Sequence, residues 1–294
     1  MAMPYDLRWM DRILIVGATG TVGRHVGASL IAAGAQVRAL VRNPETAHLP
    51  SQIEVARGDL TVPASLEEPL KGVAAVFLVW TAAPESIDPV VQRIAEKAQR
   101  IVFLSAPLKT PHPFFQQPNP IRRLAEKIEH LIAQSGLQWT FLRPGIFAAN
   151  ALRWWAPQIR AGNTVRWPYL TASTSPIHER DIATVAVHAL CENKHAGTEY
   201  VLTGPQSLTQ REQVLTIGRA IGRKLRVEEM TADEARREWT AAMWPPSVVD
   251  MLLDAWAAAT GQPAFISTTF EEITGVKPQT FLSWVIDHEI AFQR

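Results

Sequence analysis

The chain has 294 residues, enough for one large α/β domain or for a domain with a smaller lobe. Its formal charge of +1, with 47% hydrophobic and 19% charged residues, is that of an ordinary globular protein, and no basic stripe indicates a nucleic-acid partner. No apolar run of about 18 residues predicts a membrane span, and the first ten residues lack a signal-peptide core. With Cys191 as the only cysteine, no internal disulfide framework can form, so we expect a cytoplasmic protein. A monomer or a homodimer is expected.

Short β-rich apolar runs alternate with helical patterns through the first half of the chain. The predicted strands are 12–17, 36–41, 53–56, 74–80, 100–105 and 138–143. The predicted helices between them are 21–33, 63–70, 87–98 and 121–134. This alternation predicts a Rossmann-type, doubly wound parallel sheet of the α/β class, with helices on both faces.

The second half is less regular, and the Pro-rich stretch 107–120 before it is expected to be a loop. Helices are predicted at 146–162, 181–193, 208–222, 232–242, 247–260 and 280–292, and strands at 164–167, 199–203 and 225–228. We expect one of these strands, 199–203, to return to the sheet and the rest to form a small, mainly helical C-terminal lobe. The expected domains are 11–150 for a dinucleotide and 151–294 for a substrate.

A glycine-rich turn follows directly on the first predicted strand and opens the first predicted helix. Glycines in this strand–turn–helix context let backbone amides approach a pyrophosphate at the helix N-terminus. An ordinary βα turn is the alternative. The turn residues expected to bind the cofactor are Gly17, Thr19, Gly20, Thr21, Val22 and Gly23.

The residue at the end of the second strand decides between the two nicotinamide cofactors. An acidic residue there would bind the ribose 2′-hydroxyl of NAD, whereas Arg42 suits the 2′-phosphate of NADP(H). Arg38 is a second, weaker candidate, and a plain surface arginine is the alternative. Asp59 and Leu60 follow the third strand, where the adenine lies, although Asp59 could instead cap a turn.

These segments together resemble the atypical short-chain dehydrogenase/reductases of the NmrA-like group. The motifs that carry the resemblance are GATGTVG (17–23), VRALVRNP (37–44), GDL (58–60), SGLQWTFLRPGIFAAN (135–150) and HERDIATVAV (178–187). The similarity spans roughly residues 11–220. It implies a Rossmann domain with a small substrate lobe, NADP(H) as cofactor, and a nicotinamide near Pro144 and Phe147.

The chain departs from this group at the catalytic positions. Members with reductase or epimerase activity use a serine from the fifth strand and a Tyr-x-x-x-Lys pair on the next helix. The serine is present as Ser105, but Ile121 and Ala125 occupy the expected tyrosine and lysine positions. The usual proton donor is therefore missing, which leaves slower but viable hydride transfer because positioning supplies more of the rate than the acid does.

Other polar side chains near the expected site are Thr81, His112 and His178. Thr81 follows the fourth strand and is expected to line the nicotinamide end of the cofactor. His112 is more typical of a solvated loop histidine, and His178 more typical of a helix-capping segment. No set of histidines and carboxylates has a metal-ligand spacing, so no metal is expected.

Aromatic residues gather where the substrate would bind, at the carboxyl edge of the sheet. The chain has 10 Trp and 3 Tyr. Aromatic walls suit a flat, polycyclic ligand, although these rings could equally serve only to seal the small lobe. The residues expected to contact substrate are Phe114, Phe115, Phe147, Trp154 and Trp155.

The function that these features favour is an NADPH-dependent ketoreductase. The expected partner is a small hydrophobic aromatic substrate, a polycyclic ketone or quinone of the antibiotic polyketide type, and its own hydroxyl assists the reduction. A weaker resemblance to the ketoreductases that tailor aromatic polyketides, including angucyclinones of the simocyclinone type, implies the same. A non-catalytic NADP(H) sensor and an NAD(P)-dependent epimerase or isomerase are the alternatives.

Overall fold

The computed structural model of the chain describes residues 12–108, 110–117, 119–242 and 244–293. The chain forms two compact units that alternate along the sequence. Unit 1 consists of Met1–Ala106, Ile121–Pro144 and Glu179–Tyr200, and unit 2 of Pro107–Pro120, Gly145–His178 and Val201–Arg294. This division differs from the expected boundary at residue 150, because the chain returns to unit 1 for a helix and part of a strand before it completes unit 2.

Unit 1 is built on a seven-stranded sheet with the order β3-β2-β1-β4-β5-β6-β9. The pairs from β3 through to β6 are all parallel. The sequence order reverses beside β1, which makes the carboxyl ends of β1 and β4 the switch point at which such sheets bind ligands. The strands are β1 (Arg12–Val16), β2 (Val37–Val41), β3 (Glu54–Arg57), β4 (Val73–Val79), β5 (Arg100–Leu104), β6 (Gln138–Pro144) and β9 (Thr198–Leu202).

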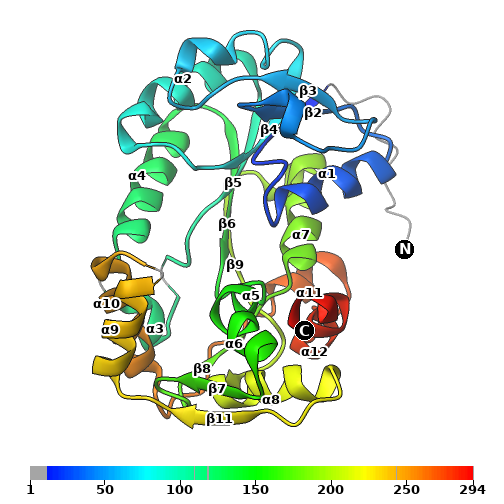
Figure 1. Cartoon of the computed structure of the whole chain (residues 1–294). Coiled ribbons are helices and arrows are strands. Elements are labelled where there is room, and N and C mark those ends of the chain that lie inside the picture. The colour runs from blue at the N-terminus through cyan, green and yellow to red at the C-terminus, as the bar shows by residue number, and fades with distance from the viewer. Residues whose placement is uncertain (1–11, 109, 118, 243, 294) are drawn as a thin grey trace. The chain divides into compact units, whose positions relative to one another are not determined.

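Helices cover both faces of this sheet, as the alternating pattern predicted (Figure 1). On one face α1 (Gly23–Ala32) packs against α7 (Glu179–Cys191). On the other, α2 (Ile87–Lys97) and α4 (Pro120–Gln134) bury their apolar stripes against alternate residues of the strands. The doubly wound Rossmann-type fold is therefore confirmed.

The helix predicted at 63–70 is the main difference within unit 1. Only a single 3₁₀ turn forms there, at Pro63–Leu66. Pro63 suits the first position of a helix, but Pro69 has no N–H and its ring would clash with the carbonyl one turn earlier. The segment therefore connects β3 to β4 without a crossover helix.

Unit 2 consists of short helices around two small sheets. Strand β11 pairs in parallel with β7, and β10 pairs antiparallel with β8. The strands are β7 (Thr164–Trp167), β8 (Ser173–Thr174), β10 (Leu208–Thr209) and β11 (Arg226–Glu229). The helices are α3 (Pro113–Gln116), α5 (Asn150–Trp154), α6 (Ala156–Ala161), α8 (Gln210–Ala220), α9 (Ala232–Ala242), α10 (Pro246–Ala259), α11 (Thr269–Thr274) and α12 (Phe281–Asp287).

The helix predicted at 146–162 is divided into α5 and α6. Trp155, between them, has φ −120° and lies outside the helical region. Pro157 is the second residue of α6, where a proline is tolerated, and α5 has already ended at Trp154. The break turns the chain, so that both Trp154 and Trp155 enter the core.

The tryptophan bias of the sequence belongs to the core of unit 2. Six indole rings, four of them from α5, β7, α9 and α10 and two from the segments next to these helices, pack with centroid distances of 4.6 to 6.1 Å, mostly edge to face. The six residues are Trp154, Trp155, Trp167, Trp239, Trp244 and Trp256. Large rings give a lobe of short helices the apolar area that its element lengths alone would not supply.

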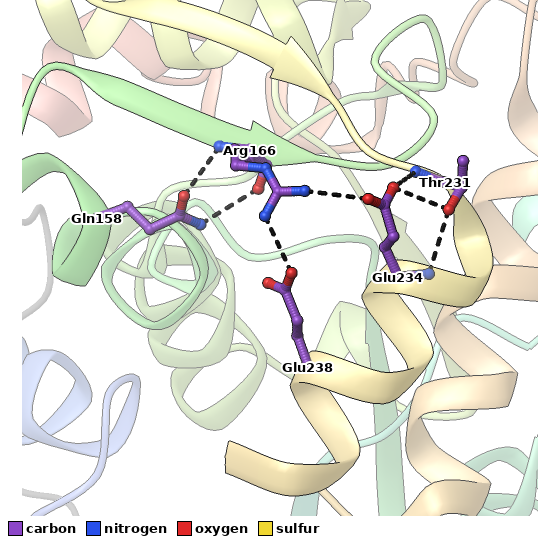
Figure 2. A network of polar contacts seen from close by, with 5 residues as sticks. All are labelled: Gln158, Arg166, Thr231, Glu234 and Glu238. Atoms are coloured by element: carbon purple, nitrogen blue, oxygen red, sulfur yellow. Dashed lines mark hydrogen bonds and ion pairs between the residues drawn. The ribbon is translucent and has the colours of Figure 1, made fainter.

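A network of hydrogen bonds and ion pairs connects α9 to β7 and α6 (Figure 2). Arg166 of β7 donates hydrogen bonds to Glu234 and Glu238, one turn apart on α9. Gln158 of α6 bonds the backbone of Arg166 through both ends of its amide. Glu234 also accepts from Thr231 at the start of α9. These side chains are partly exposed, so the network fixes the register of α9 more than it stabilises the fold.

Among the residues that the structure describes, no helix is both long enough and apolar enough to cross a membrane.

Candidate cofactor site and catalytic positions

The turn after β1 is shaped by its three glycines. Gly17 has φ +92°, a conformation that residues with a side chain rarely adopt. The N–H of Gly20 donates to the carbonyl of Gly17. A Cβ added to Gly23 would lie 2.1 Å from that same carbonyl oxygen, so only glycine allows α1 to start so close to the strand.

The start of α1 leaves amide groups available for an anion. Among the described residues, the N–H groups of Thr21, Val22 and Gly23 have no backbone acceptor, and no side chain caps the helix. No acidic residue occupies the first turn, and Thr19 and Gly20 are exposed. Unpaired amides together with the positive end of the helix dipole form a phosphate site.

A hollow of about 780 Å³ lies in unit 1 at the carboxyl ends of β2 and β3. Arg42 and Arg57 both line this hollow. Arg42 directly follows β2, and Arg57 is the last residue of β3. The two lie near each other because Val41 of β2 is paired with Arg57. Within the described part of the chain neither guanidinium forms an ion pair. Two unpaired cations in one hollow suit a phosphate group. Arg57 was not recognised from the sequence, because only the strand pairing brings it beside Arg42.

Arg38, the weaker sequence candidate for the 2′-phosphate, is excluded by the structure. Its side chain is buried and forms an ion pair with Glu54. It also donates hydrogen bonds to the carbonyls of Pro69 and Lys71. Arg38 lies near the start of β2, whereas the hollow lies at the end of this strand. Its hydrogen bonds therefore stabilise the segment before β4.

Asp59 caps a turn and lines the same hollow. Its Oδ1 accepts from both the N–H and the hydroxyl of Thr61, each at 2.8 Å. These bonds, with a smaller effect of the Arg42 charge, hold the pKa of Asp59 below its usual range, so the carboxylate is ionised. Turn capping is thus observed, and the adenine contact stays a prediction. The side chain of Leu60 is buried in the core.

The residues expected around the nicotinamide belong to both units. In unit 1, Thr81 is exposed just after β4, and Pro144 is the buried last residue of β6. In unit 2, Phe147 is half-buried and its backbone pairs with that of Ile177. Their contact with a cofactor stays a prediction.

Ser105 lies at the end of β5 and takes part in a buried ionic network. Its hydroxyl donates to Glu129 Oε1 at 2.6 Å. Glu129 also accepts two hydrogen bonds from Arg143, at 3.0 and 2.6 Å, and Arg143 reaches Glu199 at 2.6 Å. In this structure the Ser105 hydroxyl thus donates its hydrogen bond to a carboxylate, and its contact with a substrate stays a prediction. The sequence identified Ser105 but not this network, whose members come from β5, α4, β6 and β9.

The two positions of α4 that replace tyrosine and lysine carry no acid. The side chain of Ile121 is 59% exposed at the start of the helix, and Ala125 is buried one turn later. With Ser105 bonded to Glu129, none of the three positions of the usual triad offers a proton in this structure.

The aromatic residues expected to contact substrate differ in the exposure of their side chains to solvent. Phe114 and Phe115 stack edge to face at 5.0 Å, and Phe115 is half-buried, 3.4 Å from where a Cβ of Gly145 would stand. Trp155 has no exposed surface, and Trp154 is buried beside it in the tryptophan core. Trp155 therefore has no surface for a ligand and Trp154 only 7% of its own, whereas Phe115 and Phe147 are half-buried. Contact of these aromatic residues with a substrate stays a prediction.

The two histidines considered as donors have structural partners in unit 2. His112 accepts a hydrogen bond from the N–H of Phe114 and caps α3, and burial lowers its pKa. His112 is therefore a buried capping residue, not the solvated loop residue that its sequence context suggested. His178 is fully buried, 3.3 Å from Asp287 of α12, which agrees with a structural role.

Comparison with known proteins agrees with the geometry of the turn. A model of the NAD(P)H-binding family matches residues 17–193, from the first glycine of the turn to just beyond α7. The chain belongs to the NAD(P)H-binding family. The resemblance read from the motifs and the cofactor class expected from the turn are both confirmed.

Relatives of known activity match along almost their whole length. The chain is 38% identical to the (4-alkanoyl-5-oxo-2,5-dihydrofuran-3-yl)methyl phosphate reductase of Streptomyces griseus, over 95% of this chain and 99% of that protein. It is 32% identical to the NAD(P)H azoreductase of Xenophilus azovorans, over 95% and 99%. The NADPH-dependent quinone oxidoreductase of Escherichia coli has the same fold, with a TM-score of 0.78, 24% identity and coverage of 95% and 99%. This family member is therefore an oxidoreductase that uses NAD(P)H.

Proposed function

We propose that this protein is an NADPH-dependent reductase that delivers hydride to a strongly electrophilic conjugated carbonyl compound, without a proton donor from its own side chains. The observation that carries the proposal is the bond from Ser105 to Glu129, together with the apolar Ile121 and Ala125 where an acid and its lysine would stand. A plain ketone needs an acid because hydride addition leaves a localised alkoxide. A quinone does not, because the same addition leaves a delocalised, weakly basic oxyanion.

The reaction balances with one proton from solvent. NADPH gives a hydride to the quinone or conjugated alkene and becomes NADP⁺, and the resulting hydroquinone anion or enolate takes its proton from water afterwards. The protein then needs only to bind the cofactor, hold the acceptor against it and exclude water, and such positioning can supply roughly 7–11 kcal/mol of the barrier.

The activities of the relatives support this class of acceptor. One acts on a ring whose name places a carbonyl next to a ring double bond, one on azo compounds and one on quinones. In the furanone and in the quinone, the atom that receives the electrons is conjugated with a carbonyl group. The exposed edge of Phe115 and the half-buried Phe147 support an aromatic example, including the polycyclic quinone or hydroxyketone of polyketide type favoured by the sequence.

A paired-acceptor assay tests the proposal. NADPH oxidation is followed by absorbance with a naphthoquinone, and with the matching tetralone, which has an aryl ketone but no quinone ring. We expect turnover of the quinone at least about 100-fold faster, the scale of a missing general acid. Equal rates for both acceptors would contradict the proposal, and binding of NADPH without oxidation by any acceptor would favour the sensor.

Removing the Ser105 hydroxyl should have little effect on chemistry. For Ser105→Ala we expect kcat for the quinone to fall by less than about 3-fold, because the hydroxyl serves Glu129 and not the substrate. A general acid would cost about 10²–10⁴-fold. Steady-state kinetics at saturating NADPH measures the difference, and a loss above about 100-fold with unchanged thermal stability would make Ser105 the proton donor.

Arg42 should determine the preference for NADPH over NADH. Replacing Arg42 with alanine removes a charged partner of the 2′-phosphate, and bonds to charged groups are worth about 1.5–3 kcal/mol. We expect the KM for NADPH to rise about 10- to 100-fold while the KM for NADH changes little. Arg123→Ala, an exposed arginine on α4, is the matched control and should leave both values unchanged. Equal effects of Arg42→Ala on the two cofactors would place the 2′-phosphate elsewhere.

A further inference from the structure

Two histidines and a glutamate meet at the end of α7, far from the cofactor turn. His188 and Glu192 lie one helical turn apart on α7, and His195 follows in the 3₁₀ turn Asn193–His195. One possible ligand atom from each side chain lies within 4.8 Å of the other two. His188 Nδ1 is 2.6 Å from Glu192 Oε1, and His195 Nε2 is 3.4 Å from Glu192 Oε2.

We propose that His188, Glu192 and His195 form a binding site for one divalent transition-metal ion, with Zn²⁺ as its natural class of ligand. Two imidazoles and one carboxylate are a common three-residue zinc set, which leaves the fourth tetrahedral position to water. Bond lengths of about 2.0–2.2 Å place such ligands roughly 3.3 Å apart, so the cluster needs only a small contraction to reach that geometry.

His195 is the second and independent indication of a ligand. Its side chain is 98% buried, and its Nε2 has no hydrogen-bond partner within the described chain although it is directed at Glu192. A buried ring nitrogen without a partner costs free energy that a metal bond would recover. Nδ1 lies 2.8 Å from the Tyr200 hydroxyl. When Nδ1–H donates to Tyr200, Nε2 carries the free lone pair, as in the outer-shell contacts that orient metal-binding histidines.

The charges around the cluster favour a bound metal cation, which would compete with the ammonium group of a lysine. Lys194 reaches Glu192 Oε2 at 2.6 Å from an exposed position, and the ion would displace it into solvent. The negative end of the α7 dipole also lies here. Cys191 is not part of this group of side chains, so its thiol is not counted as a ligand.

The position in the fold makes this a structural site and not a catalytic one. His195 accepts a hydrogen bond at its carbonyl from Thr140 near the start of β6, and its turn leads into β9. The cluster is therefore at the amino edge of the parallel sheet, opposite to the turn at Gly17. A bound ion would join the end of α7 to the connection that places β9 at the edge of the sheet.

Metal titration of the full chain tests the site. After removal of metal with a chelator, Zn²⁺ is added and followed by calorimetry and by the midpoint of thermal unfolding, with Mg²⁺ as the oxygen-preferring comparison. We expect one Zn²⁺ per chain, a higher midpoint with Zn²⁺ and no change with Mg²⁺. Co²⁺ in place of Zn²⁺ should give the intense visible absorption of a tetrahedral site in the unaltered protein, a result that depends on no variant.

Matched variants separate this site from surface binding. His188→Gln and Glu192→Gln should each weaken Zn²⁺ binding by more than about 10-fold, and Tyr200→Phe by about 10-fold through the orientation of His195. His130→Gln, at an exposed histidine of α4, should leave it unchanged, and all variants should bind NADPH normally. Absence of saturable binding by the unaltered chain, or equal binding by His188→Gln, would show that the cluster is only a hydrogen-bonded group.

Discussion

Replacing Gly23 with alanine is expected to weaken NADPH binding by about 10- to 100-fold. The new Cβ would stand 2.1 Å from the Gly17 carbonyl oxygen and 2.7 Å from its carbon. Both contacts are with backbone, so the start of α1 must move away from β1, and overpacking of this kind costs about 1–3 kcal/mol. Since the anion site consists of amides at that helix start, the displacement falls directly on the phosphates, and each 1.4 kcal/mol is about tenfold in affinity. Fluorescence titration with NADPH measures it.

Gly27→Ala on the same helix is the matched control. Its Cβ would meet the end of the Ile53 side chain at 3.1 Å, and a flexible methyl can give way. We expect its affinity for NADPH to stay within about 3-fold of the original, because the helix start does not move. If Gly23→Ala bound NADPH as tightly as Gly27→Ala, the cofactor would not use the amides of this turn.

Replacing Glu129 with glutamine is expected to lower the free energy of unfolding by about 3 kcal/mol. The carboxylate accepts two bonds from Arg143 and one from Ser105, and the side chains of both charged partners are under one tenth exposed. Removal of one partner from a buried ion pair costs about 3–5 kcal/mol, because the other charge stays buried. Glu199 retains one contact with Arg143, which places the expected loss at the lower end. Denaturant unfolding gives the value.

Glu126→Gln provides the control on the same helix. Glu126 pairs with Arg122 at 3.1 Å, but both side chains are about a third to a half exposed. Exposed pairs contribute about 0–1 kcal/mol, so this variant should unfold almost as the original does. Similar losses for the two variants would mean that the network around Arg143 is as solvated as the surface pair.

The sequence determined the cofactor half of this protein because its signals are local. A strand, three glycines and a helix are consecutive in the chain, so Gly17, Gly20 and Gly23 define the turn before any tertiary contact is known. Arg42 was identifiable for the same reason, since it directly follows β2. The alternation of strands and helices also determined the class of fold. Among the helices predicted between residues 12 and 143, only the one at 63–70 did not form.

Only the tertiary structure could decide which side chains meet from distant segments. Strand pairing brings Arg57 beside Arg42, and Arg38 forms an ion pair with Glu54. Ser105, after β5, donates a hydrogen bond to Glu129 of α4. His195 lies near His188 because the chain turns back after α7. The hydrophobic periodicity of the sequence does not predict such a turn. Local backbone preferences are encoded within a few residues, whereas packing, burial and shared hydrogen bonds depend on every element that approaches a site. The sequence thus determined the family and the glycine-rich turn, and the fold decided which charges and hydrogen-bond donors lie around that turn.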